Sequence, residues 1–160
     1  MTTTLERLQA AVAALPVTPR VAPSADQIGY GIDLSCITDV THTLDEVDPQ
    51  SNTAIGEAII RRYITPRGTL PDDQDYGLDL RGYCNRGVTD AELRTLPSAM
   101  RMEAMKDDRL EDAGITVTWD STTRRLRATA VLRPRDSVDP FRLVFFVSGD
   151  GAELIESIGQ

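Results

Sequence analysis

Residues 53–80 read TAIGEAIIRRYITPRGTLPDDQDYGLDL, and the predicted fold depends on this stretch. Apolar side chains recur every four residues in its first half, the spacing of one helix face; they are Ile55, Ile59 and Tyr63. Glu57 and Arg61 are also four residues apart, and their opposite charges predict the solvent-facing side of this helix. Pro66 ends the helix because the residue before a proline is pushed out of the α conformation. Gly68 then allows a left-handed turn.

The composition is that of one acidic domain. The chain has 160 residues, enough for a single hydrophobic core. It carries 17 Lys and Arg against 25 Asp and Glu, a formal net charge of −8. This charge argues against nucleic acid and anionic membranes as partners, since both attract basic proteins. Apolar runs are too short to span a membrane, and the first residues lack the basic region of a signal peptide.

Residues 1–26 are expected to form an arm and a proline-rich linker before the domain. A short amphipathic helix there would place three apolar residues on one stripe: Leu5, Leu8 and Val12. A lone helix cannot bury such a stripe by itself, so it either folds back on the domain or docks on a neighbour; we favour the neighbour. The domain proper is expected at residues 27–150, followed by a tail at residues 151–160.

The segment after the first helix and its loop predicts a second helical region. Thr89 and Glu92 have the spacing of a capping box, which marks a helix start. Pro97 lies inside the apolar pattern that follows, and it either kinks one helix or begins another. We prefer a short helix at residues 90–95 and a longer one from Pro97 to about Lys106. The methionines of this region are expected to pack in the core.

The last third of the domain predicts a sheet. Apolar and polar residues alternate with a period of two over residues 115–119, 125–133 and 141–147. These runs predict an α+β fold, with a C-terminal antiparallel meander packed against two or three helices. The final run is apolar on both faces near Val144 and Phe146, which fits either a central strand or an edge that another chain covers. We favour the edge; the tail is a fourth short strand or a frayed end.

The chain offers no recognisable catalytic or metal-binding pattern. Neither a glycine-rich phosphate loop nor a nucleophile motif is present. His42 is the single histidine and has no partner ligand nearby, and the acidic loop at residues 72–75 lacks the frame of a calcium site. Cys36 and Cys84 are expected to be free thiols. We therefore predict no catalytic residue, no cofactor and no metal.

Two motifs carry a resemblance to a known family. RRYITPRGTLPDDQDYGLDL resembles a signature of the small baseplate wedge proteins that initiate the sheath of contractile phage tails and related injection systems. In that family a helix ends in T-P-R-G or similar, and an acidic-Tyr-Gly step follows; here these are residues 65–68 and 75–77. The family also carries an acid-Pro-Arg-apolar motif after its last helix. The matching residues are Asp107, Asp108 in place of the proline, Arg109 and Leu110.

The resemblance implies a structural protein without a cofactor. It implies a place in a virion tail baseplate or injection particle, assembled in the bacterial cytoplasm as a sixfold ring around the tail tube. The implied partners are wedge subunits, hub or tube-initiator proteins and the sheath protein. Docking onto partners is implied for Pro66, Arg67, Gly68, Tyr76, Asp107, Arg109 and Leu110. Sheath strands are expected to pair with the final predicted strand, at Phe141, Leu143, Val144, Phe145 and Phe146.

Two other functions stay open at the level of sequence. Some members of this family have been labelled lysozyme-like, so one alternative is a small muramidase-like lytic enzyme. A glycosidase needs two carboxylates at a set separation, and no acid here stands out as a general acid in an apolar pocket. An aromatic content of 5% also offers little platform for a sugar. The other alternative is a standalone adaptor, which neighbouring sheath and tube genes would argue against.

Overall fold

The computed structural model describes residues 33–34, 46–48, 50–135 and 139–159. The chain divides into two units, residues 1–31 and 32–160, and the described residues all belong to the second unit. The predicted arm with Leu5, Leu8 and Val12 lies outside the described residues, as do Cys36 and His42. Within the described part, no helix has the length and apolar character needed to cross a membrane.

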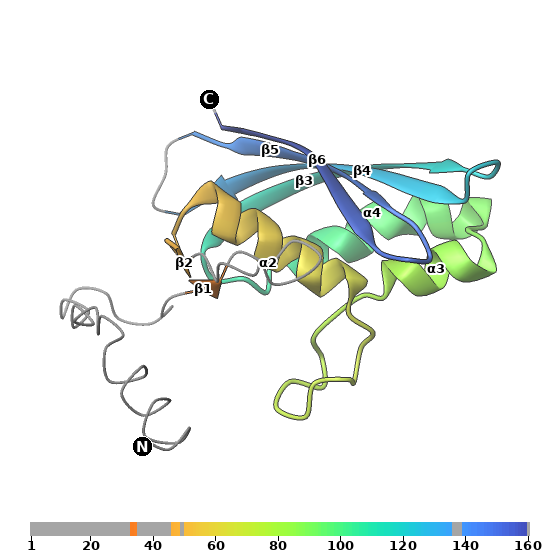
Figure 1. The fold of residues 1–160 in the computed structure, drawn as a ribbon, viewed down its shortest axis with the longest axis horizontal. Helices are drawn as coiled ribbons and strands as arrows, with labels where there is room; N and C mark the ends of the chain where they lie inside the picture. The colour runs from red at the N-terminus through yellow and green to blue at the C-terminus, as the bar shows by residue number, and fades with distance from the viewer. Residues whose placement is uncertain (1–32, 35–45, 49, 136–138, 160) are drawn as a thin grey trace, which may run out of the picture. The chain divides into compact units, whose positions relative to one another are not determined.

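The largest element is a four-stranded antiparallel sheet in the order β3-β4-β5-β6 (Figure 1). Its strands are β3 (Leu110–Asp120), β4 (Arg125–Pro134), β5 (Phe141–Val147) and β6 (Ala152–Gly159). A separate two-stranded sheet joins β1 (Asp33–Leu34) to β2 (Glu46–Val47). The predicted α+β class with a C-terminal antiparallel meander is therefore confirmed.

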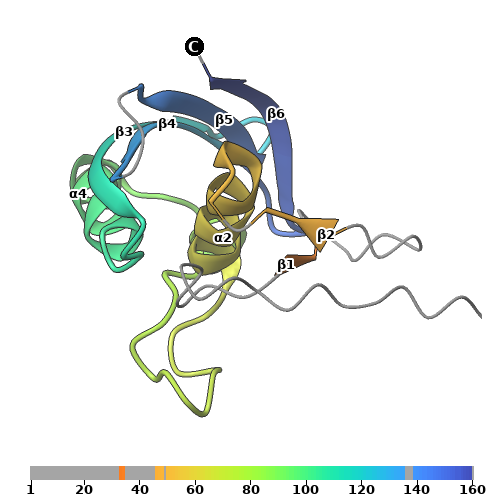
Figure 2. The same cartoon turned by 90° about the vertical axis from the view of Figure 1, so that its left-hand side faces the viewer.

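The helices of the described part lie on one face of the four-stranded sheet (Figure 2). They are α2 (Asn52–Ile64), α3 (Leu80–Arg86) and α4 (Asp90–Ala104). The ring of Tyr63 stacks on Phe145 with centroids 5.8 Å apart, and its hydroxyl donates to the carbonyl of Met100 at 3.1 Å. A Cβ added at Gly56 would lie 3.2 Å from Leu143, so this glycine lets α2 approach the sheet closely. The core therefore forms between the helices and the inner face of the sheet.

The alternation predicted for the sheet matches the burial of β4. Leu126, Ala128, Ala130 and Leu132 are buried, and the residues between them are exposed or half-buried. β3 begins at Leu110, five residues before the predicted start at 115, and its register shifts between Leu110 and Asp112. An irregular pairing of this kind breaks the strict alternation, and the period of two therefore misses the start of the strand.

The prediction that the 141–147 strand is an open edge is wrong. β5 pairs with β4 on one side and with β6 on the other. The alternative of a fourth strand is the one observed, because β6 occupies residues 152–159, beyond the expected domain end at 150. Phe141, Leu143, Val144 and Phe145 are buried and Phe146 is half-buried. Their apolar character on both faces is that of a central strand. The edges of this sheet are β3 and β6.

The helical predictions need three corrections. α4 is one helix that contains Pro97, not two helices. Leu96 and Met100 are buried on either side of the proline, and their packing favours one continuous helix. The capping box at Thr89 is present as predicted. Met102 is 68% exposed and does not pack in the core. α3 was not predicted; Asp79 caps it by accepting a bond from the backbone N–H of Gly82 at 3.0 Å.

Glu57 was predicted on the solvent-facing side of its helix, and the structure buries it instead. It is only 2% exposed, because α2 buries every residue from Ala54 to Glu57 and so is enclosed on both sides near its start. Arg61 lies 3.8 Å from its carboxylate, as the i,i+4 spacing predicted. The pairing could therefore be predicted from the sequence, whereas the burial of Glu57 could not.

Candidate partner-docking site

The loop of residues 66–77 leaves the end of α2 and returns beside it. The backbone N–H of Leu78 donates to the carbonyl of Arg62 at 3.1 Å, and that of Asp79 donates to the carbonyl of Thr65 at 3.1 Å. Figures 1 and 2 both show the loop projecting from the helical side of the domain, away from the sheet. The two halves of the family-like motif therefore meet at the base of this loop.

Two glycines give the loop its path. Gly68 has a φ of 83°, which is the left-handed conformation predicted for it. Gly77 has a φ of 102°, and a Cβ built on it would lie 2.3 Å from the carbonyl oxygen of Thr65. No L side chain fits at such a distance, so the Tyr-Gly step can close against the T-P-R-G turn only with glycine at position 77.

A buried carboxylate, that of Glu103 on α4, holds the loop base together. Glu103 is 1% exposed. Its Oε1 accepts from the backbone N–H of Gly77 at 2.9 Å and lies 3.4 Å from Nη1 of Arg62. Its Oε2 accepts from Nη2 of Arg67 at 2.9 Å and from Nζ of Lys106 at 2.9 Å. We call these groups, together with Asp75, the Glu103 cluster.

The rest of the Glu103 cluster joins the outer part of the loop to α4. Asp75 pairs with Nζ of Lys106 at 2.7 Å and with Nη1 of Arg67 at 3.2 Å. Nε of Arg67 donates to the carbonyl of Gly77 at 3.0 Å. The guanidinium of Arg62 lies 4.4 Å from the ring centroid of Tyr76, a cation–π contact. Charged groups from α2, the loop and α4 thus form one network.

The electrostatics of Glu103 keep its carboxylate ionised. Burial acts to raise the pKa of Glu103, but the hydrogen bonds from Lys106 and Gly77 and the charges of Lys106 and Arg67 outweigh it, so the pKa lies below its ordinary value. A glycosidase general acid needs the reverse, a carboxyl group kept protonated by a raised pKa. Glu103 is therefore suited to hold the loop and unsuited to donate a proton.

The second family-like motif forms a two-pronged ion pair. Nε of Arg109 donates to Oδ1 of Asp107 at 2.8 Å, and Nη2 donates to Oδ2 at 2.6 Å. The Asp107 and Arg109 side chains are 8% and 13% exposed. Burial acts to raise the pKa of Asp107, but the hydrogen bonds and charge of Arg109 lower it overall. Asp108 is exposed, and the fork forms without the proline that the family has there.

Leu110 cannot serve in docking as the resemblance implied. It is 0% exposed, and it begins β3 inside the core cluster. Leu110 instead anchors the motif to the sheet. Of the other residues of the motif, Asp108 is exposed and Arg109 is half-buried.

The two motifs converge at Arg62. Its guanidinium bonds to Glu103, stacks on Tyr76 and acts to lower the pKa of Asp107. Asp107 in turn acts to raise the pKa of Tyr76. Arg62 therefore links the base of the 66–77 loop electrostatically to the largely buried Asp107–Arg109 fork, although some 30 residues separate loop and fork in the sequence.

A shallow groove of about 570 Å³ lies beside the Glu103 cluster. Apolar atoms of Pro66, Leu78, Ala99 and Met102 line it, and the charged groups of Arg67, Asp75 and Lys106 border it. Such a surface fits a partner with an apolar side chain flanked by polar groups. We call the groove, the Glu103 cluster and the Asp107–Arg109 fork the docking region.

Several residues of the docking region were not singled out from the sequence, among them Arg62, Glu103, Lys106 and Met102. One signal for Glu103 was present, because it lies seven residues after Leu96 and three after Met100, at the spacing of the buried stripe of α4. An acid on an apolar stripe indicates a buried partner. Met102 had no such signal, because an exposed methionine on a helix does not stand out from one that packs in the core.

Metal chemistry receives no support from this region. In the described ranges, no three His, Cys, Asp or Glu side chains are grouped so that they could hold a metal ion. Cys84 is a free, buried thiol, as predicted; burial raises its pKa, and its Sγ donates to the carbonyl of Val147 at 3.4 Å.

The chain matches no protein-family model and no curated protein.

Proposed function

We propose that this chain is a structural baseplate component of a contractile tail or injection machine. In this role it joins wedge and hub proteins to the first sheath ring, in a particle assembled in the bacterial cytoplasm. The observation that carries the proposal is the convergence of both family-like motifs on the docking region around Glu103. Residues that resemble a docking signature, and that lie far apart in sequence, are linked through the charges of Arg62 and Glu103.

The sheath-initiating part of the proposal needs a free sheet edge, and β6 supplies it. Within the described residues, β6 pairs with β5 alone and is the last strand of the sheet, and an added strand would pair along its outer side. β3 is the poorer edge. Nε of Arg101 already donates to the carbonyl of Ala113 at 2.9 Å, Arg101 pairs with Asp112 at 2.7 Å, and the strand is irregular there.

Hydrogen exchange of the full chain tests both parts of this proposal. The chain is mixed with a sheath protein, where its gene neighbourhood encodes one, and separately with any wedge subunits encoded there. Sheath protein is expected to slow amide exchange along residues 152–159 by about tenfold or more, because new strand pairing protects those N–H groups. Wedge subunits are expected to slow exchange in residues 66–77. β3 serves as the matched control edge, and its exchange stays unchanged.

Protection confined to the helices and the 66–77 loop when sheath protein is added would exclude strand pairing at β6. The absence of sheath and tube genes near this one would favour the adaptor alternative. Turnover of purified peptidoglycan by the full chain, with no turnover in a digest that lacks the protein, would favour the lytic alternative.

A further inference from the structure

The edge strand β6 contains one residue that its pairing with β5 does not use. Val144 is paired with Glu156. The next residue of β5, Phe145, is paired with Leu154. Ile155 therefore has no residue of β5 opposite it, which is the arrangement of a β-bulge. The ladder between the central strands β4 and β5 has no such shift.

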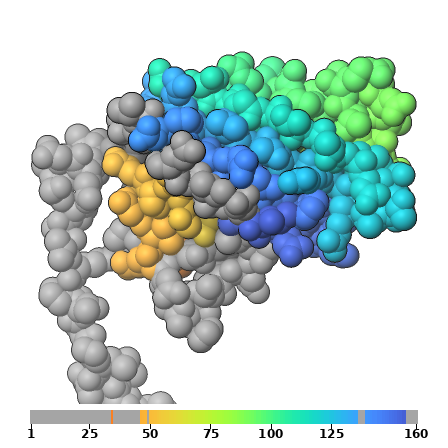
Figure 3. Space-filling view, turned by 90° about the horizontal axis from the view of Figure 1, so that it is seen from above, coloured from red at the N-terminus to blue at the C-terminus, as the bar shows by residue number. Residues whose placement is uncertain are grey.

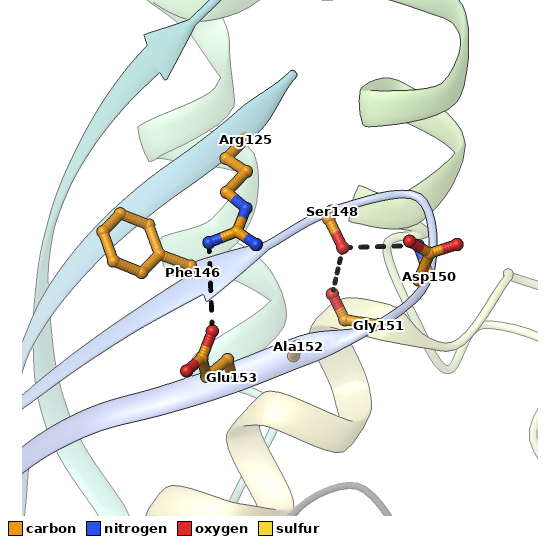
Figure 4. A pocket seen from close by; sticks show the side chains of 7 residues that line it. All are labelled: Arg125, Phe146, Ser148, Asp150, Gly151, Ala152 and Glu153. Carbon is orange, nitrogen blue, oxygen red and sulfur yellow. Dashed lines mark hydrogen bonds and ion pairs between the residues drawn. The ribbon is translucent and has the colours of Figure 1, made fainter. Parts of the chain in front are cut away.

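The turn before β6 prevents the strand from sliding to absorb this extra residue. The backbone N–H of Ser148 donates to the carbonyl of Gly151 at 2.8 Å, and that of Asp150 donates to the Ser148 hydroxyl at 3.3 Å. Figure 4 shows this turn, and beside it Glu153 at 4.0 Å from Arg125 on β4. The first residues of β6 are therefore held in register from the side of the turn, and the extra residue stays at position 155.

The pairing with β5 does not require Ile155. The pairs on the two sides of the bulge involve Val144 and Phe145, which are neighbouring positions on β5. A β6 that lacked Ile155 would therefore keep its pairs with β5 and the alternation of its faces. Ile155 is 49% exposed, whereas Leu154 packs against the core. The effect of the bulge therefore falls on the outer side of β6.

The outer side of β6 is a border of the sheet. In Figure 3, which looks from above, the dark blue residues of β6 lie beside the blue ones of β5, and β4 and β3 follow. A bulge bends its strand and increases the twist there, so β6 is divided into two runs, residues 152–154 and 156–159. Each run is shorter than a usual strand of about five to six residues. A straight strand laid along β6 can therefore pair with one run but not with both.

We infer that the bulge at Ile155 keeps the β6 edges of two copies of this chain from pairing with each other. Two such edges would meet antiparallel about a twofold axis, which is the contact that an open edge offers to a second copy. Ile155 lies outside the ladder geometry in each copy, so the shared ladder would break into runs too short to hold two molecules together. The exposed charge of Glu153 adds to this effect, because charged residues on an edge also oppose pairing. The inference concerns the chain alone and does not depend on the proposed sheath-initiating role.

Deleting Ile155 from the full chain tests the inference. The deletion gives β6 a regular ladder and a straight outer side, so we expect the chain to form dimers. Sedimentation equilibrium is expected to show self-association at least about tenfold tighter than that of the parent. Hydrogen exchange in residues 152–159 is expected to slow as the protein concentration rises, because the new strand pairing protects those N–H groups.

Two matched controls keep the bulge. Ile155→Ala removes the exposed apolar side chain, and Glu153→Gln removes the charge on the edge. Both variants are expected to stay monomeric like the parent, because the extra residue is still present. Dimers of either control through β6 would assign the effect to the side chain or to the charge, and would overturn the inference.

The stability of the deletion chain is part of the same test. It is expected to melt within a few degrees of the parent, because its pairs with β5 are kept. A deletion that unfolds the domain overturns the inference, since it would show that the pairing with β5 depends on Ile155. So does a deletion chain that stays monomeric up to about 0.5 mM, a dimer in which residues 152–159 gain no protection, or a parent chain that already dimerises through β6.

Discussion

At the scale of single residues, Glu103 has the largest consequence for the docking region. One carboxylate accepts from Gly77, Arg67 and Lys106 at 2.9 Å each. A buried charge is stabilising only while its partners are in place. Since two of these partners come from the loop and Lys106 follows the end of α4, the loop position and the burial of Glu103 depend on each other.

Replacing Glu103 by glutamine tests this dependence. The Glu103→Gln side chain keeps the shape but leaves Arg62, Arg67 and Lys106 without their central anion. We expect the free energy of unfolding to fall by about 1–3 kcal/mol, measured by urea denaturation, and tryptic cleavage within residues 66–77 to become faster. Glu111→Gln on β3, an exposed acid, is the matched control. Equal urea midpoints for Glu103→Gln and the parent would contradict the assigned role.

At the scale of secondary structure, the position of β5 changes what a substitution there does. Val144 is 4% exposed and is paired with Thr129 on β4 and Glu156 on β6. On an edge strand, a proline at this position could block an incoming chain and leave the domain folded. In a central strand, proline removes a ladder hydrogen bond from the middle of the sheet.

Val144→Pro is therefore expected to unfold the domain instead of acting on partners. The loss of stability should reach about 3 kcal/mol or more, measured as the urea midpoint. Val144→Ala, which keeps the backbone donor and removes only part of the side chain, is the control and should cost clearly less. A folded Val144→Pro domain with the stability of the alanine variant would mean that β5 is not held from both sides.

At the scale of the whole molecule, two of the buried carboxylates, those of Glu103 and Asp107, make the free energy of unfolding depend on pH. The pKa values of Glu103 and Asp107 are both lowered in the folded state. The unfolded state therefore binds more protons as the solution is acidified, and stability rises with pH in that range. The contribution is complete above the ordinary carboxyl pKa of about 4 and is lost as pH falls through the lowered folded values.

Denaturant midpoints measured from pH 7 to pH 3 check this dependence. We expect little change down to about pH 5 and a steep fall below it. The difference between the parent and Glu103→Gln should shrink as the pH falls, since acid protonates the carboxyl group that the substitution removes. A difference that stays constant down to pH 3 would show that Glu103 does not contribute through its charge.

Much of the secondary structure was determined by local sequence. The apolar face of α2, the capping box at Thr89, the turn at Gly68 and the alternation of β4 each depend on residues within a few positions of one another. Apolar periodicity and the residue types at turns and helix caps are properties of neighbouring residues, so they can be seen in the sequence itself. The class of fold and most of its strands could therefore be predicted.

The docking region and the open edge were decided by the tertiary structure. Glu103 meets Gly77 and Arg67, which lie 26 and 36 residues away in the sequence, so its burial could not follow from its neighbours on α4. Pro97 stays inside one helix because the buried residues on both sides of it pack in the same core. Whether β5 or β6 is the edge depends on a single chain reversal after Val147. Burial and pairing belong to contacts between distant segments, and no local pattern carries them.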